Sequence, residues 1–323
     1  MPQPVAYITR RIPSEAVDVL RAVAEVRQWD SDDPIPRHVL LREVKEADAL
    51  FPMITERIDE EVLERAPRLK IVANMAVGYD NIDVPACTSH SVQVTNTPDV
   101  LTETSADLAF ALLMSAARRI VQGDRYVRRG EWKIWGPLLH LTPDIHAATL
   151  GIVGLGRIGQ AVARRALGFD MHVLYFSRTR RQDLEIELGY EYAELPGLLA
   201  RSDFVSIHLA LNEGTRHFFG AEQFKQMKGS AMLINTGRGP LVDQRALYEA
   251  LRDGDIAGAA LDVTDPEPIS MDDPLLSLEN CIITPHVGSA SFGTRTRMAT
   301  LAAKNIAAVL AGKPPLTPVN SLG

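Results

Sequence analysis

Three glycines in the spacing G-x-G-x-x-G, at Gly154, Gly156 and Gly159, most constrain the fold of this chain. The apolar run 148–153 before them predicts a strand, and the helical pattern of residues 160–167 after them predicts a helix. In such a unit the first glycine permits a tight turn, the second lets the backbone approach a pyrophosphate, and the third lets the helix pack on the strand. The stretch therefore predicts a dinucleotide-binding turn. The alternative is an ordinary strand-to-helix turn without a ligand.

The next strand is predicted at 171–176, and the residues after it lie where a dinucleotide fold binds the adenosine ribose. An NAD site commonly places Asp or Glu there to accept hydrogen bonds from the ribose 2′-hydroxyl. This chain instead has Ser177, Arg178, Thr179, Arg180 and Arg181. Hydroxyl groups and planar guanidinium donors suit a 2′-phosphate, so the sequence favours NADPH, with NADH possible. The alternative is a solvated basic surface.

Short apolar runs at 203–209, 230–236 and 256–263 predict further buried parallel strands. Residues 220–227 and 244–253, between these runs, have helical spacing with charged outer positions. This alternation is typical of a doubly wound parallel α/β sheet, the Rossmann arrangement. Ligands of such sheets bind beyond the carboxyl ends of the strands. This rule selects His208, Asn235 to Arg238, Asp262 and the segment after Ile283.

The bulk properties indicate a globular protein of two domains. A chain of 323 residues exceeds the size at which one core usually keeps growing. A net charge of −7 argues against a nucleic-acid partner. Because residues 1–11 lack an apolar signal core and no run is long enough for a membrane span, we expect no membrane association and a cytoplasmic location. Neither the two cysteines nor the histidines have metal-ligand spacing, so no metal is expected.

The first hundred residues predict a second, smaller α/β unit. Strands are predicted at 5–9, 49–53 and 69–75, with helices at 14–23 and 59–65. The last helix, at about 293–310, could cover this unit. We therefore expect a substrate domain of residues 1–99 and 290–323 and a cofactor domain of residues 100–289, with a ligand cleft at the two crossings. The Pro-rich tail 313–318 is expected to be loosely ordered.

A long apolar helix is predicted at 102–120, followed by a helix and an aromatic loop within 123–136. Trp132 and Trp135 in this connecting segment suggest an interface or a pocket wall, and core packing is the alternative.

Three ionisable residues, Arg238, Glu267 and His286, lie in loops after the late strands. Hydride transfer to a 2-oxo acid needs a group that holds the carboxylate and a group that protonates the developing alkoxide. Arg238 suits the first role and His286 the second, with Glu267 as the carboxylate that favours the protonated imidazole. Each residue alone has an ordinary structural alternative: a surface salt bridge, a loop end or a strand cap. Their joint occurrence with the glycine turn favours the catalytic interpretation.

With these residues in place, the chain resembles the D-isomer-specific 2-hydroxyacid dehydrogenases nearly end to end, and within them the glyoxylate and hydroxypyruvate reductases. The resemblance lies in residues 77–83, 96–98, 101–107, 151–159, 235–239, 260–263, 266–268 and 285–289. It implies a flavodoxin-like substrate domain and a homodimer that forms through the 101–150 region. Ala210 departs from the pattern, because the family commonly has proline there.

The resemblance also implies the roles of individual residues. His286 is the general acid/base, Glu267 its partner and Arg238 the substrate anchor. Substrate contacts are expected from Val77 and Gly78 through backbone N–H groups, and from Arg238, His286, Met53 and Trp135. Asp262 is expected to meet the nicotinamide amide. The whole predicted cofactor site comprises Thr104, Gly154, Gly156, Arg157, Ile158, Gly159, Ser177, Arg178, Thr179, Arg181, His208, Leu209, Ala210, Thr215, Thr236, Gly237, Arg238, Asp262, His286 and Gly288.

The sequence therefore predicts an NADPH-preferring reductase of small 2-oxo acids such as glyoxylate and hydroxypyruvate. Two alternatives remain open. One is a nicotinamide-nucleotide-sensing protein like the family's corepressors, and the other is a related enzyme such as a D-lactate or phosphoglycerate dehydrogenase.

Overall fold

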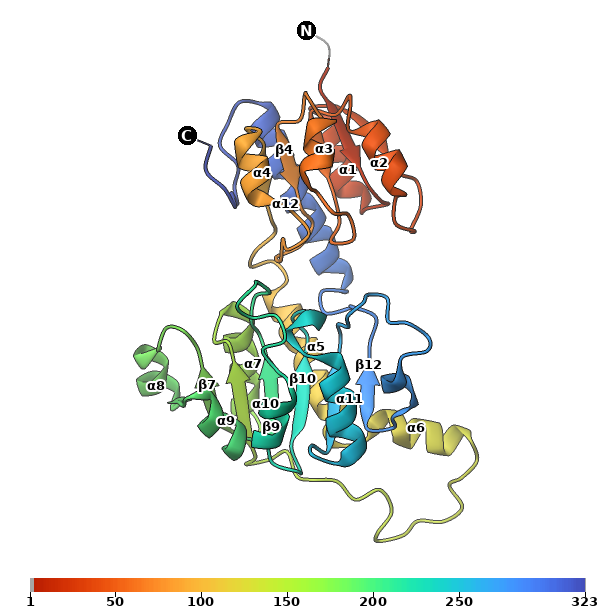
Figure 1. Ribbon diagram of the computed structural model, residues 1–323, viewed down its shortest axis with the longest axis vertical. Helices are drawn as coiled ribbons and strands as arrows, with labels where there is room; N and C mark the ends of the chain where they lie inside the picture. Colours follow the sequence, from red (N-terminus) through yellow and green to blue (C-terminus); the bar gives the residue numbers. More distant parts are fainter. Residues whose placement is uncertain (1–2, 323) are drawn as a thin grey trace. The chain divides into compact units, whose positions relative to one another are not determined.

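The computed structural model of this chain describes residues 3–322 and divides into two units. The first unit contains the chain up to Leu101 and again from Ser289, and the second unit is Thr102–Gly288. The chain thus passes from one unit to the other twice, after Leu101 and after Gly288 (Figure 1).

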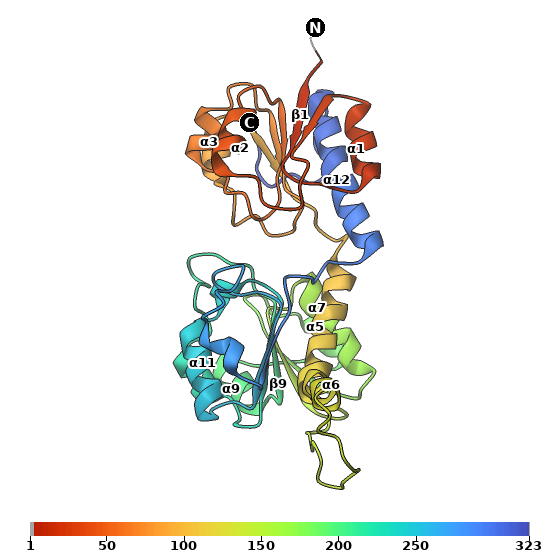
Figure 2. The same ribbon diagram turned by 90° about the vertical axis from the view of Figure 1, so that its right-hand side faces the viewer.

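The first unit is built on a parallel sheet with the strand order β2-β1-β3-β4-β5 in the described residues. Its strands are β1 (Val5–Ile8), β2 (Glu25–Gln28), β3 (Ala49–Phe51), β4 (Ile71–Ala73) and β5 (Gln93–Thr95). Its helices are α1 (Ser14–Arg21), α2 (Arg37–Glu43), α3 (Glu60–Glu64), α4 (Val84–Ser89) and α12 (Phe292–Leu310). Helices α1 and α12 lie on one face of the sheet, with α2 and α3 on the other (Figure 2). This order is the flavodoxin-like arrangement, which confirms the expected fold.

The C-terminal tail is ordered against the first unit, so the expectation of a loosely ordered terminus is wrong. Asn305, buried in α12, accepts hydrogen bonds from the N–H groups of Leu316 and Thr317 at 2.8 and 3.1 Å. Val319 N–H donates to Val94 O at 2.8 Å, and Asn320 Oδ1 accepts from Val94 N–H at 2.7 Å. Backbone pairing with β5 thus overrides the proline content of the tail.

The second unit has the strand order β12-β11-β10-β9-β6-β7-β8, again with parallel pairing throughout its described strands. Its strands are β6 (Thr149–Val153), β7 (His172–Phe176), β8 (Glu191–Tyr192), β9 (Phe204–Ile207), β10 (Met232–Asn235), β11 (Gly258–Leu261) and β12 (Cys281–Ile283). The strand order reverses between β6 and β9, as in a Rossmann fold. The predicted strands of this unit are confirmed, each shorter than predicted by one to four residues in total.

Helices cover both faces of this sheet (Figure 2). They are α5 (Thr102–Ala117), α6 (Ile120–Arg128), α7 (Arg157–Leu167), α8 (Gln182–Leu188), α9 (Leu195–Arg201), α10 (Ala221–Gln226) and α11 (Gln244–Asp253). Helices α5 and α7 pack with Leu150 and Ile152 on one face, and α9, α10 and α11 form the core of the other face. Short 3₁₀ turns at Gly239–Leu241 and Pro274–Ser277 interrupt the loops.

The helix predicted over 102–120 ends early. Its last residue is Ala117, and Arg119 has a φ of +49°, which turns the chain into the separate helix α6. Beyond α6, Trp132 and Trp135 are 57% and 75% exposed, so core packing within the described chain is excluded for both rings. No helix within residues 3–322 is long and apolar enough to cross a membrane.

Candidate active site

The strands of the second unit end in a common register. Val153 pairs with Ile207, Ile207 with Asn235, Asn235 with Leu261, and Leu261 with Ile283. Because these strands are parallel, the residues that follow their ends leave the sheet along one edge. Those residues are Gly154, His208, Thr236, Asp262 and Thr284. The structure therefore brings together the strand-end positions that the sequence selected.

The three glycines of the turn are each explained by their surroundings. A Cβ on Gly154, whose φ is +101°, would lie 2.7 Å from His208 O. A Cβ on Gly159 would lie 2.2 Å from Gly154 O, so this glycine lets α7 approach β6. Apart from Gly156 and its two chain neighbours, no atom of the described residues lies within 4 Å of the Cβ position at Gly156, just before α7. The protein's own packing requires the first and third glycines, and the second leaves open space beside the helix N-terminus.

Other features of this edge fit a nucleotide cofactor. Thr236 Oγ1 is buried and has no hydrogen-bond partner within residues 3–322, as expected for a group that meets a ligand. His208 Nε2 lies 2.9 Å from Ser206 Oγ, and desolvation lowers the pKa of His208 to about 4. Its imidazole is therefore neutral at physiological pH and adds no positive charge to the edge.

The remaining predicted cofactor residues of this edge lie in its loops or in the helices beside it. Thr215 Oγ1 donates to Ala210 O at 2.7 Å and closes the loop after β9, in which Leu209 packs at Gly154. Arg157 and Ile158 form the first turn of α7, and Thr104 lies in the first turn of α5.

The loop 177–181 after β7 contains three arginines that differ in their partners. Arg180 binds Glu185 through two hydrogen bonds of 2.8 and 2.7 Å. Arg181 binds Asp183 through two hydrogen bonds of 3.0 and 2.6 Å. The Arg178 side chain is exposed and makes no hydrogen bond or ion pair with the described part of the chain. Among the three, Arg178 is therefore the guanidinium with none of its N–H donors already bound within the described residues.

His286 and Glu267 form a direct pair. His286 Nδ1 lies 2.8 Å from Glu267 Oε2, and Glu267 Oε1 accepts a 3.1 Å hydrogen bond from Thr264 N–H. An ionised carboxylate only accepts hydrogen bonds, so Nδ1 carries the proton and Nε2 is left for other chemistry. Both side chains are about one-third exposed.

Asp262 holds the backbone of the His286 loop. Its buried carboxylate accepts hydrogen bonds from Val287 N–H at 2.9 Å, Gly288 N–H at 2.7 Å and Thr284 Oγ1 at 2.6 Å. His286 N–H donates to Asp262 O at 3.0 Å, and His286 has a φ of +53°. Sequence reasoning assigned Asp262 a nicotinamide contact but missed this loop-holding role, because its partners lie more than twenty residues along the chain.

The Arg238 loop rests on the Glu267 loop. Asn235 folds the turn, since its side chain accepts from Gly237 N–H at 3.0 Å and donates to Arg238 O at 2.9 Å. A Cβ on Gly239 would lie only 1.9 Å from Thr264 O. The Arg238 and Glu267 loops are thus in backbone contact, and only glycine fits between them.

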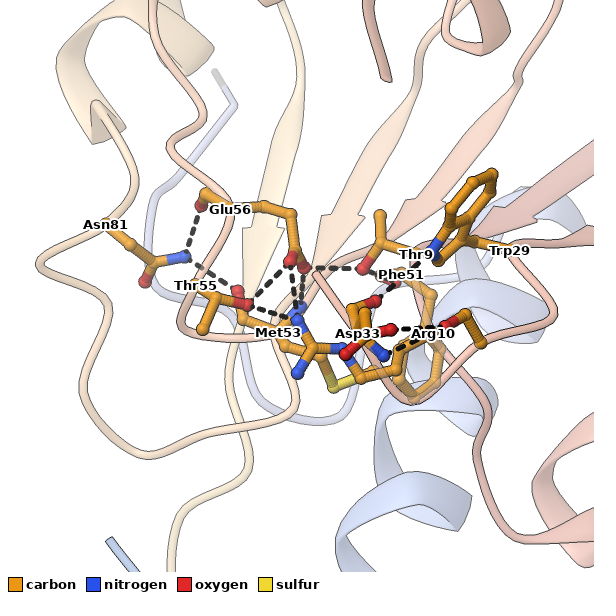
Figure 3. A network of polar contacts seen from close by, with 10 residues as sticks. Thr9, Arg10, Trp29, Asp33, Phe51, Met53, Thr55, Glu56 and Asn81 are labelled. Atoms are coloured by element: carbon orange, nitrogen blue, oxygen red, sulfur yellow. Dashed lines mark hydrogen bonds and ion pairs between the residues drawn. The ribbon is translucent and has the colours of Figure 1, made fainter. Parts of the chain in front are cut away.

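The predicted substrate loops of the first unit share a separate polar network (Figure 3). Glu56 is buried, and its Oε2 accepts from Met53 N–H at 2.7 Å and from Thr9 Oγ1 at 2.5 Å. Asn81 Nδ2 donates to Met53 O at 3.1 Å and to Glu56 O at 2.9 Å. Sequence reasoning missed Glu56, because no local pattern marks a buried carboxylate in a turn.

The Val77–Gly78 loop is joined to this network by Asn74. Asn74 Nδ2 donates to Gly78 O at 2.9 Å and to Asn81 Oδ1 at 3.3 Å, and Asn96 Nδ2 donates to Val77 O at 2.8 Å. The carbonyl groups of the loop are therefore occupied. The N–H groups of Val77 and Gly78 donate to no acceptor within residues 3–322, which suits the binding of an anion.

No group of three or more His, Cys, Asp or Glu side chains within residues 3–322 is placed to hold a metal ion.

Comparison with known proteins decides the family. The model of the D-isomer specific 2-hydroxyacid dehydrogenase NAD-binding domain matches residues 110–288. A glyoxylate reductase of Korarchaeum cryptofilum is 53% identical over 98% of this chain and 96% of its own length. The chain belongs to the D-isomer specific 2-hydroxyacid dehydrogenase family.

Two further similar proteins are consistent with this assignment. The glyoxylate reductase of Pyrococcus horikoshii is 52% identical over 98% of this chain and 96% of its own. The crystal structure of an NADPH-dependent glyoxylate/hydroxypyruvate reductase from Sinorhizobium meliloti, in complex with NADP and malonate, is 33% identical with a TM-score of 0.86, covering 98% of this chain and 97% of that chain. This chain is accordingly an NAD(P)-dependent dehydrogenase that reduces 2-oxo acids.

Gly239→Ala tests the backbone contact between the Arg238 loop and the Glu267 loop. Gly239→Ala is expected to lower the free energy of unfolding by about 1–3 kcal/mol, because the new Cβ must displace Thr264 and with it Glu267. Urea denaturation checks the stability, and turnover of a 2-oxo acid is expected to fall with it. Gly229→Ala is the matched control, since its Cβ would meet nothing closer than Gly254 O at 3.9 Å. Equal stability of the two variants would contradict the contact.

Proposed function

We propose that this dehydrogenase reduces small 2-oxo acids such as glyoxylate and hydroxypyruvate to D-2-hydroxy acids, with NADPH as the preferred cofactor. The observation that carries the proposal is the pair formed by His286 Nδ1 and Glu267 Oε2 at 2.8 Å. The loop that contains Glu267 is also in backbone contact with the Arg238 loop. The relatives from Korarchaeum cryptofilum and Pyrococcus horikoshii are named glyoxylate reductases, which supports glyoxylate as a substrate. The Sinorhizobium meliloti enzyme, an NADPH-dependent glyoxylate/hydroxypyruvate reductase, supports both the second substrate and the cofactor.

The proposed chemistry divides between the cofactor and three side chains. A bound nicotinamide supplies the hydride that reaches the 2-oxo carbon. Arg238 binds the substrate carboxylate through its planar guanidinium. His286 donates the Nε2 proton to the oxygen as it becomes an alkoxide, and Glu267 stabilises the imidazolium through Nδ1. In the reverse direction the same nitrogen removes the hydroxyl proton.

Other residues have proposed binding roles. Val77 and Gly78 donate their N–H groups to the substrate carboxylate, and Met53 and Trp135 shape the substrate pocket. Asp262 contacts the nicotinamide amide, while Ser177, Arg178 and Thr179 bind the 2′-phosphate. The open space at Gly156 and the unpartnered hydroxyl of Thr236 support cofactor binding at this strand edge.

His286→Ala tests the acid/base role. We expect the turnover number with glyoxylate and NADPH to fall by about 10²-fold or more, because the alkoxide loses its proton donor. Nicotinamide absorbance measures turnover, and nicotinamide fluorescence is expected to show unchanged NADPH binding. His146→Ala, at an exposed histidine paired with Asp170, is the control. Unchanged turnover in His286→Ala would remove this residue from the mechanism, and a wild type inactive on every small 2-oxo acid would favour a nucleotide sensor.

Arg178→Ala tests the cofactor preference. We expect the Michaelis constant for NADPH to rise by about tenfold, since one charge-assisted contact to phosphate is lost, while that for NADH stays nearly constant. Arg201→Ala, which breaks a surface pair with Glu191, serves as the control. Equal losses with both cofactors would show that Arg178 does not bind the 2′-phosphate.

A homodimer is the proposed assembly. The segment 120–141 carries a series of exposed apolar side chains: Ile120, Val127, Trp132, Ile134, Trp135, Leu138, Leu139 and Leu141. Apolar surface of this extent in one segment is typical of an interface. We propose that a second copy of the chain covers it, as the family resemblance implies.

Light scattering of the purified protein checks the assembly. The expected mass is twice the 35.5 kDa of one chain, and Trp132→Ser with Leu138→Ser is expected to shift it toward one chain. A wild-type mass of a single chain at micromolar concentration would contradict the homodimer.

A further inference from the structure

The loop 177–181 is tied back to the strand from which it starts. It leaves β7 after Phe176 and ends where α8 begins at Gln182. The buried ring of Tyr175, on β7, places its hydroxyl against the far end of the loop. That hydroxyl accepts a 2.7 Å hydrogen bond from Arg181 N–H and lies 2.7 Å from Glu185 Oε1. One side chain therefore closes the loop at its base.

Glu185 completes this closure. The Glu185 carboxylate accepts two hydrogen bonds from the Arg180 guanidinium, at 2.8 and 2.7 Å. Only 17% of the Glu185 side chain is exposed. Hydrogen bonds from Arg180 and Tyr175 lower the pKa of Glu185 to about 2, so it is ionised at neutral pH and Tyr175 is the donor. The Arg180 guanidinium also lies over the Tyr192 ring, 5.4 Å from its centroid.

These contacts separate the three arginines of the loop. Arg180 is bound by Glu185 and Arg181 by Asp183, whereas Arg178 has no partner within the described residues. With both ends of a five-residue loop fixed, the position of Arg178 follows from the closure at Tyr175.

We propose that Tyr175 is a positioning residue for cofactor selectivity: its hydroxyl, bound to Arg181 N–H and Glu185, holds the loop in the conformation that binds the 2′-phosphate. This inference rests on the proposed NADPH preference. It assigns selectivity to a buried hydroxyl that itself touches no phosphate.

Tyr175→Phe isolates this role. The ring and its edge contact with Tyr192, at 5.5 Å between centroids, are kept, so the hydrophobic core is preserved. Only the hydroxyl is lost, which leaves Arg181 N–H and Glu185 Oε1 each without one partner. NADH lacks the 2′-phosphate and does not depend on the position of Arg178.

The experiment measures dissociation constants of NADPH and NADH by nicotinamide fluorescence, without turnover. In Tyr175→Phe we expect the NADPH dissociation constant to rise about fivefold, as for loss of one hydrogen bond, and the NADH constant to change less than twofold. Tyr192→Phe is the matched control, because its hydroxyl donates to Glu194 and the ring under Arg180 is kept. We expect the control to retain the wild-type ratio of the two constants.

The outcomes distinguish failure of the positioning role of Tyr175 from failure of the proposed NADPH preference. A Tyr175→Phe protein with the wild-type NADPH-to-NADH ratio, whether both constants change or neither does, overturns the positioning role. If Arg178→Ala nevertheless abolishes the preference for NADPH over NADH, the proposed function stands. A wild type that binds both cofactors equally overturns the NADPH preference, and the inference with it.

Discussion

The common register of the strand ends in the second unit is the constraint on which the candidate site depends. Val153, Ile207, Asn235, Leu261 and Ile283 are linked by successive pairing across parallel strands. Backbone hydrogen bonding therefore fixes where the following loops begin. A shift of one residue in any strand would turn its side chains to the opposite face and move its loop away from the shared edge.

The loops on this edge are then fixed to one another by a few close contacts. The Asp262 carboxylate accepts hydrogen bonds from the Thr284 hydroxyl before His286 and from the N–H groups of Val287 and Gly288 after it, and Glu267 is held by Thr264 N–H. Gly239 lies directly on Thr264, which leaves no room for a side chain. Because an acid/base group works only within hydrogen-bond reach of the reacting oxygen, this bracing sets where the imidazole acts in the mechanism that we propose.

Much of this arrangement could be predicted from the sequence, because local patterns encode it. Apolar runs marked the strands, glycine spacing marked the turn at Gly154, and both fold units were expected. The break at Arg119, in the charged pair that follows the apolar run, was not predicted, since a single left-handed residue leaves no periodic signal. The ordered tail, the Glu56 network and the loop-holding role of Asp262 depend on partners far along the chain. Such contacts appear only when the fold places the segments side by side.

The arginines after β7 show that the same limit applies to predicting which side chains can bind a ligand. The residue types after β7 indicated a phosphate-binding loop, and the family resemblance pointed to Ser177, Arg178 and Thr179 as its contacts. What the sequence did not show is that Glu185 and Asp183 already bind the two neighbouring arginines. Charge counting along a segment overstates the cations available to a ligand. The proposed 2′-phosphate contacts remain Ser177, Arg178 and Thr179, and the ion pairs of Arg180 and Arg181 support this choice.

The most direct test of the central claim, that this strand edge carries out hydride transfer to a 2-oxo acid, follows the hydride itself. Hydroxypyruvate is incubated with the enzyme and NADPH dideuterated at nicotinamide C4, and the product is analysed by NMR and chiral chromatography. The account predicts D-glycerate with one deuterium on C2. A product without deuterium at C2, or the L isomer, would contradict it.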